Sequence, residues 1–214
     1  MNMKNLNKKI GYMLLLVASQ SSLAVTDDYL KQMATLDQEW NDYAPASVNV
    51  QNLESLLVQV EGIGESLAQE RLMAANRATL IKHYDLVLKL QENALKLLDA
   101  NANVGTSDYC NAATFAEDAR LKIVGLYVAE INYLNQLAPR YVNQGNLGLL
   151  DTTEAARQAA VSGKVTTLQN STNALKAVAV DRNALYQANT ATGFATCKAK
   201  LAQIAEQIAA IVVP

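Results

Sequence analysis

The two cysteines are the residues in this sequence best suited to covalent chemistry. Cys110 and Cys197 are the only cysteines, and each lies in a segment that resembles the first turn of a helix. In an oxidising compartment, an even number of cysteines indicates a structural bridge rather than a pair of reactive thiols. We therefore predict a Cys110–Cys197 disulfide, which would stabilise the fold by about 4 to 5 kcal/mol as an upper estimate.

The sequence lacks the usual catalytic and metal-binding patterns. His83 is the only histidine, so a site that needs two imidazoles from one chain is excluded. Position 80 is leucine, which excludes the Glu-x-x-His pair of di-iron bundles, and no haem-attachment or Gly-x-Ser-x-Gly motif is found. We interpret His83, between Lys82 and Tyr84, as a surface or boundary residue. We predict that the protein is not an enzyme and uses neither a cofactor nor a metal.

Three charged residues fall on or beside apolar rows of the predicted helices, namely Glu70, Arg77 and Glu130. If they are buried and paired, they set the register between helices or line a cavity for a small ligand. Alternatively, the rows turn toward solvent at these positions, and this is the interpretation that we favour.

Tyrosine is the prevalent aromatic residue, with nine tyrosines against two phenylalanines. Four of them, Tyr84, Tyr127, Tyr133 and Tyr141, lie on two of the predicted long helices. Their amphipathic rings are suited to a contact surface for a partner. Packing at the boundary of the bundle, with the hydroxyl groups in water, is an equally natural interpretation.

The N-terminal segment indicates export. Three lysines (Lys4, Lys8 and Lys9) precede a short apolar run, and Ser22-Leu23-Ala24 has the small residues that a signal peptidase requires. We predict a signal peptide over residues 1–24, cleaved after Ala24, and hence a periplasmic or secreted protein. Cleavage removes three positive charges and takes the net charge from −2 to −5. The acidic balance and the lack of a Lys/Arg cluster argue against nucleic acid as a partner.

The elements that must position these residues are helices. The composition favours helix formers, and no alternating strand pattern bounded by turn residues occurs. Residues 25–214 are predicted to form a single domain. Capping residues and turn sequences divide it into helices at 27–43, 49–61, 65–100, 108–143, 152–192 and 195–213.

Three of these helices are long, of similar length and joined by short turns. This pattern predicts an all-α fold, an elongated up-down helical bundle of three long helices plus shorter flanking helices. In an up-down-up arrangement, Cys110 and Cys197 fall at the same end of the bundle. The topology therefore supports the disulfide that the cysteine count predicts.

Two patterns refine this picture. An apolar residue recurs every seven positions from Leu53 to Leu95, which is typical of a coiled-coil-like seam inside a multi-helix bundle. Gly62 and Gly64 interrupt this repeat and together lower the helix propensity by about 2 kcal/mol, so we expect a kink or break there. Gly193 is expected to end the 152–192 helix in a left-handed conformation.

The apolar C-terminal segment is predicted to be a core helix and not a membrane span. An apolar face is flanked by Lys198, Lys200 and Glu206, which make the segment too polar to cross a bilayer. The face consists of Cys197, Leu201, Ile204, Ile208, Ile211 and Val212.

These features lead to a prediction of an exported helical-bundle protein that acts through protein–protein interaction. An envelope or appendage assembly factor and a toxin-neutralising factor both match this description, with a protein partner in the cell envelope or extracellular space. Two alternatives remain open. One is a membrane-acting, pore-forming-like protein, and the other is a sensor that binds a small ligand within the bundle around Glu70 and Arg77.

Overall fold

A computed structural model describes residues 27–44, 48–60, 67–100, 104–144 and 152–214. Throughout this part of the chain the regular structure is helical and no strand occurs, which confirms the predicted all-α class. The helices are α2 (Asp27–Tyr43), α3 (Val50–Val60), α4 (Leu67–Ala100), α5 (Ser107–Gln144), α6 (Thr152–Ala188), the 3₁₀ turn η2 (Thr192–Phe194) and α7 (Ala195–Ala210). The break expected at Gly62 and Gly64 lies outside the described residues.

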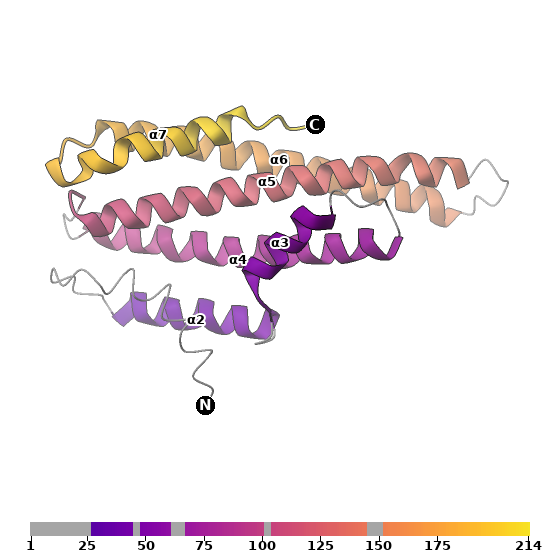
Figure 1. Ribbon diagram of the computed structural model, residues 1–214, viewed down its shortest axis with the longest axis horizontal. Helices are drawn as coiled ribbons and strands as arrows, with labels where there is room; N and C mark the ends of the chain where they lie inside the picture. Colours follow the sequence, from indigo (N-terminus) through magenta and orange to yellow (C-terminus); the bar gives the residue numbers. More distant parts are fainter. Residues whose placement is uncertain (1–26, 45–47, 61–66, 101–103, 145–151) are drawn as a thin grey trace.

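Three long rods form the centre of the molecule, as expected. Helices α4, α5 and α6 contain 34, 38 and 37 residues, and each runs antiparallel to the one before it, as in an up-down-up bundle. At 1.5 Å per residue they are about 51 to 57 Å long. Helix α7 lies along one edge against α5 and α6, whereas α2 lies at the opposite edge against α4, and α3 crosses α4 obliquely (Figure 1).

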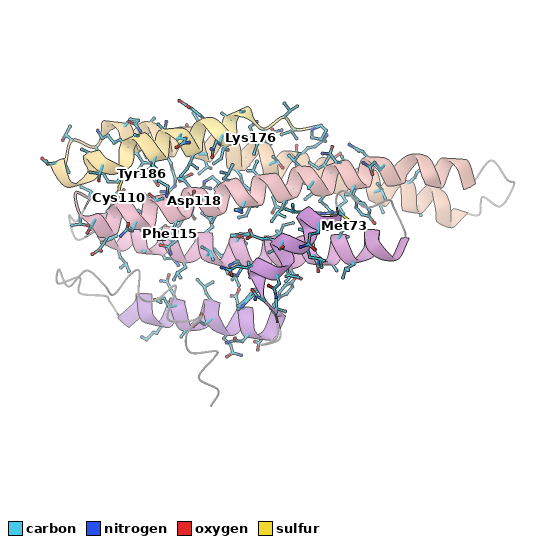
Figure 2. The ribbon with its side chains drawn as sticks, in the orientation of Figure 1. Met73, Cys110, Phe115, Asp118, Lys176 and Tyr186 are labelled. Atoms are coloured by element: carbon cyan, nitrogen blue, oxygen red, sulfur yellow. A yellow bond between two sulfur atoms is a disulfide. The ribbon has the colours of Figure 1, made fainter. Side chains whose placement is uncertain are left out.

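The disulfide is present where the topology placed it. Cys110 in the first turn of α5 is bonded to Cys197 in the first turn of α7, with the two Cα atoms 5.8 Å apart. The Thr106 side chain accepts a hydrogen bond from the Tyr109 backbone N–H (3.2 Å) and thereby caps the start of α5. Cys110 and Tyr186 lie at this same end of the bundle (Figure 2).

A tight crossing of two loops closes this end of the bundle. A Cβ atom on Gly193 would overlap the carbonyl oxygen of Gly105, so close backbone approach requires glycine there. The expectation that Gly193 ends the preceding helix is wrong, because α6 already ends at Ala188. The next residue, Asn189, donates a hydrogen bond to the Val104 carbonyl and accepts one from the Ala191 N–H, which turns the chain away from the helix axis.

The main core lies next to the disulfide. Phe194 is completely buried and packs against the rings of Tyr109 and Tyr186, at centroid distances of 5.5 and 5.9 Å. One face of α5 consists of small buried residues that allow the rods to approach closely, namely Ala112, Ala113, Ala116 and Ala119. Leu88 and Leu95 of the seven-residue repeat are buried in this core, whereas Ala74 and Ile81 of the same row are only half-buried.

The C-terminal segment is a core helix for most of its predicted length. Cys197, Leu201, Ile204 and Ile208 are buried against α5 and α6. The prediction fails at its end, because α7 stops at Ala210 and the last residues are extended. Val212 is consequently 80% exposed instead of forming part of the apolar face.

Candidate functional site

Arg77 and Glu130 form a buried ion pair between α4 and α5. The Arg77 Nε donates to the Glu130 carboxylate at 2.8 Å, and the two side chains are 5% and 8% exposed. Lys164 of α6 contacts the other carboxylate oxygen, also at 2.8 Å, and the Arg77 guanidinium lies 4.9 Å from the Tyr133 ring centroid. The favoured interpretation, in which these rows turn toward solvent, is therefore wrong for Arg77 and Glu130.

Together with Lys164, this pair joins all three rods. Among the described residues, one terminal nitrogen of Arg77 and the side-chain nitrogen of the neighbouring Asn76 have no hydrogen-bond partner, although both are buried. Such groups lower stability because they lose hydration without replacement. The side chain of Glu70, the third charge predicted for this site, lies outside the described residues. Within the described part of the chain, no cluster of His, Cys, Asp and Glu could hold a metal ion.

A second polar network lies closer to the disulfide. Arg120 is almost fully buried and contacts Glu117 and Glu92, each at 3.0 Å, and the Tyr186 hydroxyl lies 3.4 Å from Glu117. Burial raises the pKa of Glu117 despite the opposing effect of Arg120. Because the groups come from α4, α5 and α6, the network aligns the same three rods as the Arg77–Glu130 pair.

His83 is buried, which contradicts its assignment to the surface or boundary. Its ring is 8% exposed and lies edge-on to Trp40 of α2, with the ring centroids 4.9 Å apart, and to Tyr84 on its other side at 5.1 Å. Burial lowers the pKa of His83 to about 4, although Glu54 of α3 opposes this shift. The imidazole is therefore neutral at ordinary pH and serves as an aromatic contact for α2.

Three of the four tyrosines of the predicted contact surface make contacts within the molecule. Tyr84 donates a hydrogen bond to Glu54 of α3, Tyr127 packs against the main core, and Tyr133 lies beside Arg77. All three rings are half-buried. The Tyr141 side chain lies outside the described residues.

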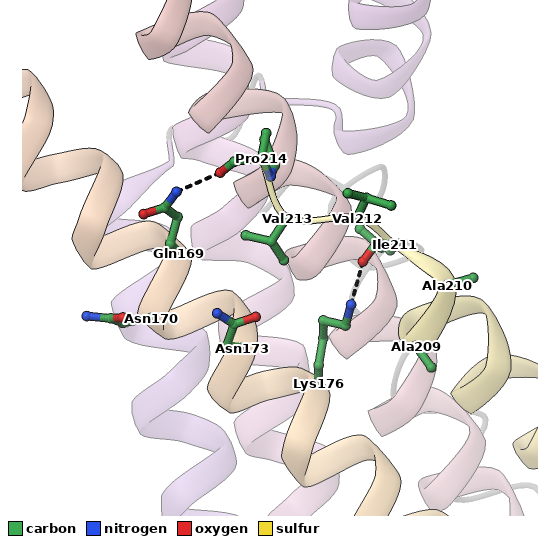
Figure 3. A pocket seen from close by; sticks show the side chains of 10 residues that line it. All are labelled: Gln169, Asn170, Asn173, Lys176, Ala209, Ala210, Ile211, Val212, Val213 and Pro214. Carbon is green, nitrogen blue, oxygen red and sulfur yellow. Dashed lines mark hydrogen bonds between the residues drawn. The ribbon is translucent and has the colours of Figure 1, made fainter.

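An open groove between α6 and the C-terminal segment has a volume of about 560 Å³. It is lined by α6 side chains and by the last six residues of the chain (Figure 3). Gln169 donates to the Pro214 carbonyl at 2.6 Å, and Lys176 donates to the Ile211 carbonyl. These hydrogen bonds fasten the extended C-terminus along α6.

The outer face of α6, opposite the buried residues Thr172, Ala179 and Tyr186, is the most unusual exposed surface in the described part of the chain. Three of the exposed large hydrophobic residues, Val178, Val180 and Leu185, lie within eight residues of this helix. Val178 and Leu185 are seven positions apart and so lie on this one face. Val180 lies toward α7. Gln187, seven positions later and so on the same side of α6, donates a hydrogen bond to the carbonyl of Lys198 in α7.

We define this outer face by its exposed residues at helical spacing. Its N-terminal half consists of Ala156, Ala159, Ala160, Gly163, Thr166 and Thr167. Its C-terminal half consists of Ala174, Ala177, Val178, Asp181, Ala184 and Leu185, and Asn170 lies between the halves. Asp181 is the only charged residue among these positions, whereas the exposed face of a helix in water ordinarily carries several charges.

The sequence alone gives only a weak signal for this surface. Alanine, glycine and threonine carry no distinctive chemistry, so their recurrence at spacings of three and four does not by itself indicate a contact surface. The useful signal is the scarcity of charged residues on the side of α6 that lies opposite its buried residues.

None of the described helices combines the length and apolar character that a membrane span requires. Comparison with known proteins finds no family model that matches the chain, and no curated protein or solved structure with significant similarity to it.

Proposed function

We propose that this protein is an exported interaction protein whose docking surface is the outer face of α6. The observation that carries the proposal is the exposure of uncharged residues along this face, where Leu185 is 71% and Val178 is 39% exposed. Burying such a face against a partner removes apolar area from water without desolvating charges. The N-terminal leader pattern and the disulfide support export to an oxidising compartment.

The rest of the molecule supports this role by holding α6 rigid. The Arg77–Glu130–Lys164 contacts join α6 to α5 and α4, and the Arg120 network joins the same three helices. Helix α7 covers one flank of α6. A rigid, preformed surface loses little conformational entropy on binding.

Site-specific photo-crosslinking in the native host tests the proposal. A photoreactive amino acid at Ala177, on the outer face, is expected to give a discrete crosslinked product. The same photoreactive amino acid at Ala75, an exposed position on α4, is the matched control and is expected to give no crosslinked product. Leu185→Lys should abolish the product formed at Ala177. Equal crosslinking from both positions, or none from Ala177, would contradict the assignment of this face.

A further inference from the structure

We infer that the partner of the α6 outer face is a second copy of the same chain, packed antiparallel along it. This inference rests on the proposed function and specifies its occupant. The two halves of the face differ in size, because the bulky residues Val178 and Leu185 lie in the C-terminal half. The N-terminal half presents only small residues, and there is open space beside Gly163.

An antiparallel arrangement matches the bulky half of one copy to the small half of the other. With a two-fold axis at the level of Thr172, Leu185 faces Ala160 of the second copy, and Val178 faces Thr167. Such an isologous interface is self-complementary, since each contact occurs twice. Small residues opposite large ones also allow the helix ridges to fit into grooves.

The charges favour the same arrangement. In this register Asp181, the only charged residue of the face, lies beside Gly163 of the second copy and within reach of its Lys164. The Lys164 side chain is 56% exposed and contacts Glu130 at 2.8 Å, so a carboxylate of a second copy would share this lysine with Glu130. A parallel pairing would instead place Asp181 against Asp181 and leave the bulky residues opposed to one another, and both contacts are unfavourable.

The size of the face sets the expected strength of association. From Ala156 to Leu185 the face is about 44 Å long and about 10 Å wide, which gives on the order of 450 Å² per partner. This lies below the roughly 800 Å² of a standard interface. We therefore expect a reversible dimer with a dissociation constant of about 10 to 100 µM.

Analytical ultracentrifugation of the purified, disulfide-bonded protein tests this inference across that concentration range. The unmodified protein is expected to shift from monomer to dimer. Leu185→Lys should weaken association by at least about tenfold. Leu72→Lys, at an exposed leucine of α4, is the matched control and should leave association unchanged.

A charge reversal tests the register. Gly163→Glu places a carboxylate opposite Asp181 of the second copy and should weaken the dimer. Adding Asp181→Lys should restore it, because the opposed charges then attract. A parallel dimer would not be restored, because each of the two changes would then oppose like charges.

Failure of this inference can be distinguished from failure of the proposed function. A protein that stays monomeric, or whose dimer tolerates Leu185→Lys, overturns the second copy as partner. If the double variant fails to restore association, the antiparallel packing of the two copies is wrong. If the Ala177 crosslink then contains a different protein, the outer face of α6 remains the docking surface and only its occupant changes. If Ala177 gives no specific crosslink at all, the proposed function itself is wrong.

Discussion

The two edges of the bundle attach a short helix to the long rods by different means. At one edge, α7 is bonded to α5 through Cys110–Cys197 and buries Leu201 and Ile208 between two rods. At the other edge, α2 packs against α4 through half-buried side chains, including Trp40 against His83. We therefore expect the α7 edge to respond mainly to the redox state and the α2 edge to respond to pH.

Removal of the disulfide is expected to have the largest effect. The bond spans a sequence separation of 87 residues, so the Cys110→Ala/Cys197→Ala variant should lose about 4 to 5 kcal/mol of unfolding free energy as an upper estimate. Urea denaturation followed by far-ultraviolet circular dichroism measures the loss.

The emission of Trp40, the only tryptophan, provides the internal control for this variant. In the absence of denaturant it should be unchanged, because α2 contacts α4 and not the disulfide end of α7. A variant with an unaltered urea midpoint would show that the apolar contacts alone hold α7 in place.

Titration of His83 is expected to give the next largest effect, at the opposite edge. Its folded-state pKa of about 4 lies below the ordinary value of 6.5, so the unfolded chain binds the proton first. The stability contribution is complete above about pH 6.5 and is lost as the pH falls toward 4. The loss then approaches about 3 kcal/mol. Over the same range, release of α2 should expose Trp40 and shift its emission to longer wavelength.

The His83→Phe variant isolates this effect from the titration of carboxylates. Phenylalanine keeps a buried aromatic ring against Trp40 but cannot bind a proton, so the dependence of Trp40 emission between pH 6.5 and 4 should be reduced. The neighbouring charges to consider are Glu54 and Lys122 near Tyr84, and the Glu39–Lys82 pair between α2 and α4. If the variant and the parent protein respond identically, those groups and not His83 control the edge.

These two edges also differ in how well the sequence predicts them. The lengths of the rods and the position of Cys110 follow from capping and turn residues, and up-down connectivity alone then brings Cys197 to the same end. The burial of His83 depends instead on Trp40, which comes from another helix whose docking leaves no local signature. The sequence therefore predicts a surface or boundary position for His83, although it places the helix of His83 correctly.

The interior charges show the same limit of prediction. The spacing of Arg77 and Glu130 on apolar rows marked them as unusual, but these residues are 53 positions apart. Whether they meet depends on the axial register of α4 against α5, which helix periodicity does not determine. The outer face of α6 was missed for a related reason, because its exposure depends on which faces the neighbouring helices leave uncovered.

The smallest predicted effect concerns the ion pair that joins α2 to α4. Lys82 and Glu39 are 3.5 Å apart, and their side chains are 31% and 45% exposed. Solvent screens such a pair, so Glu39→Gln should cost less than about 1 kcal/mol. The same change should also reduce the salt dependence of Trp40 emission at neutral pH. A loss comparable to that expected from His83 protonation would show that α2 is held mainly by charge and not by the Trp40–His83 contact.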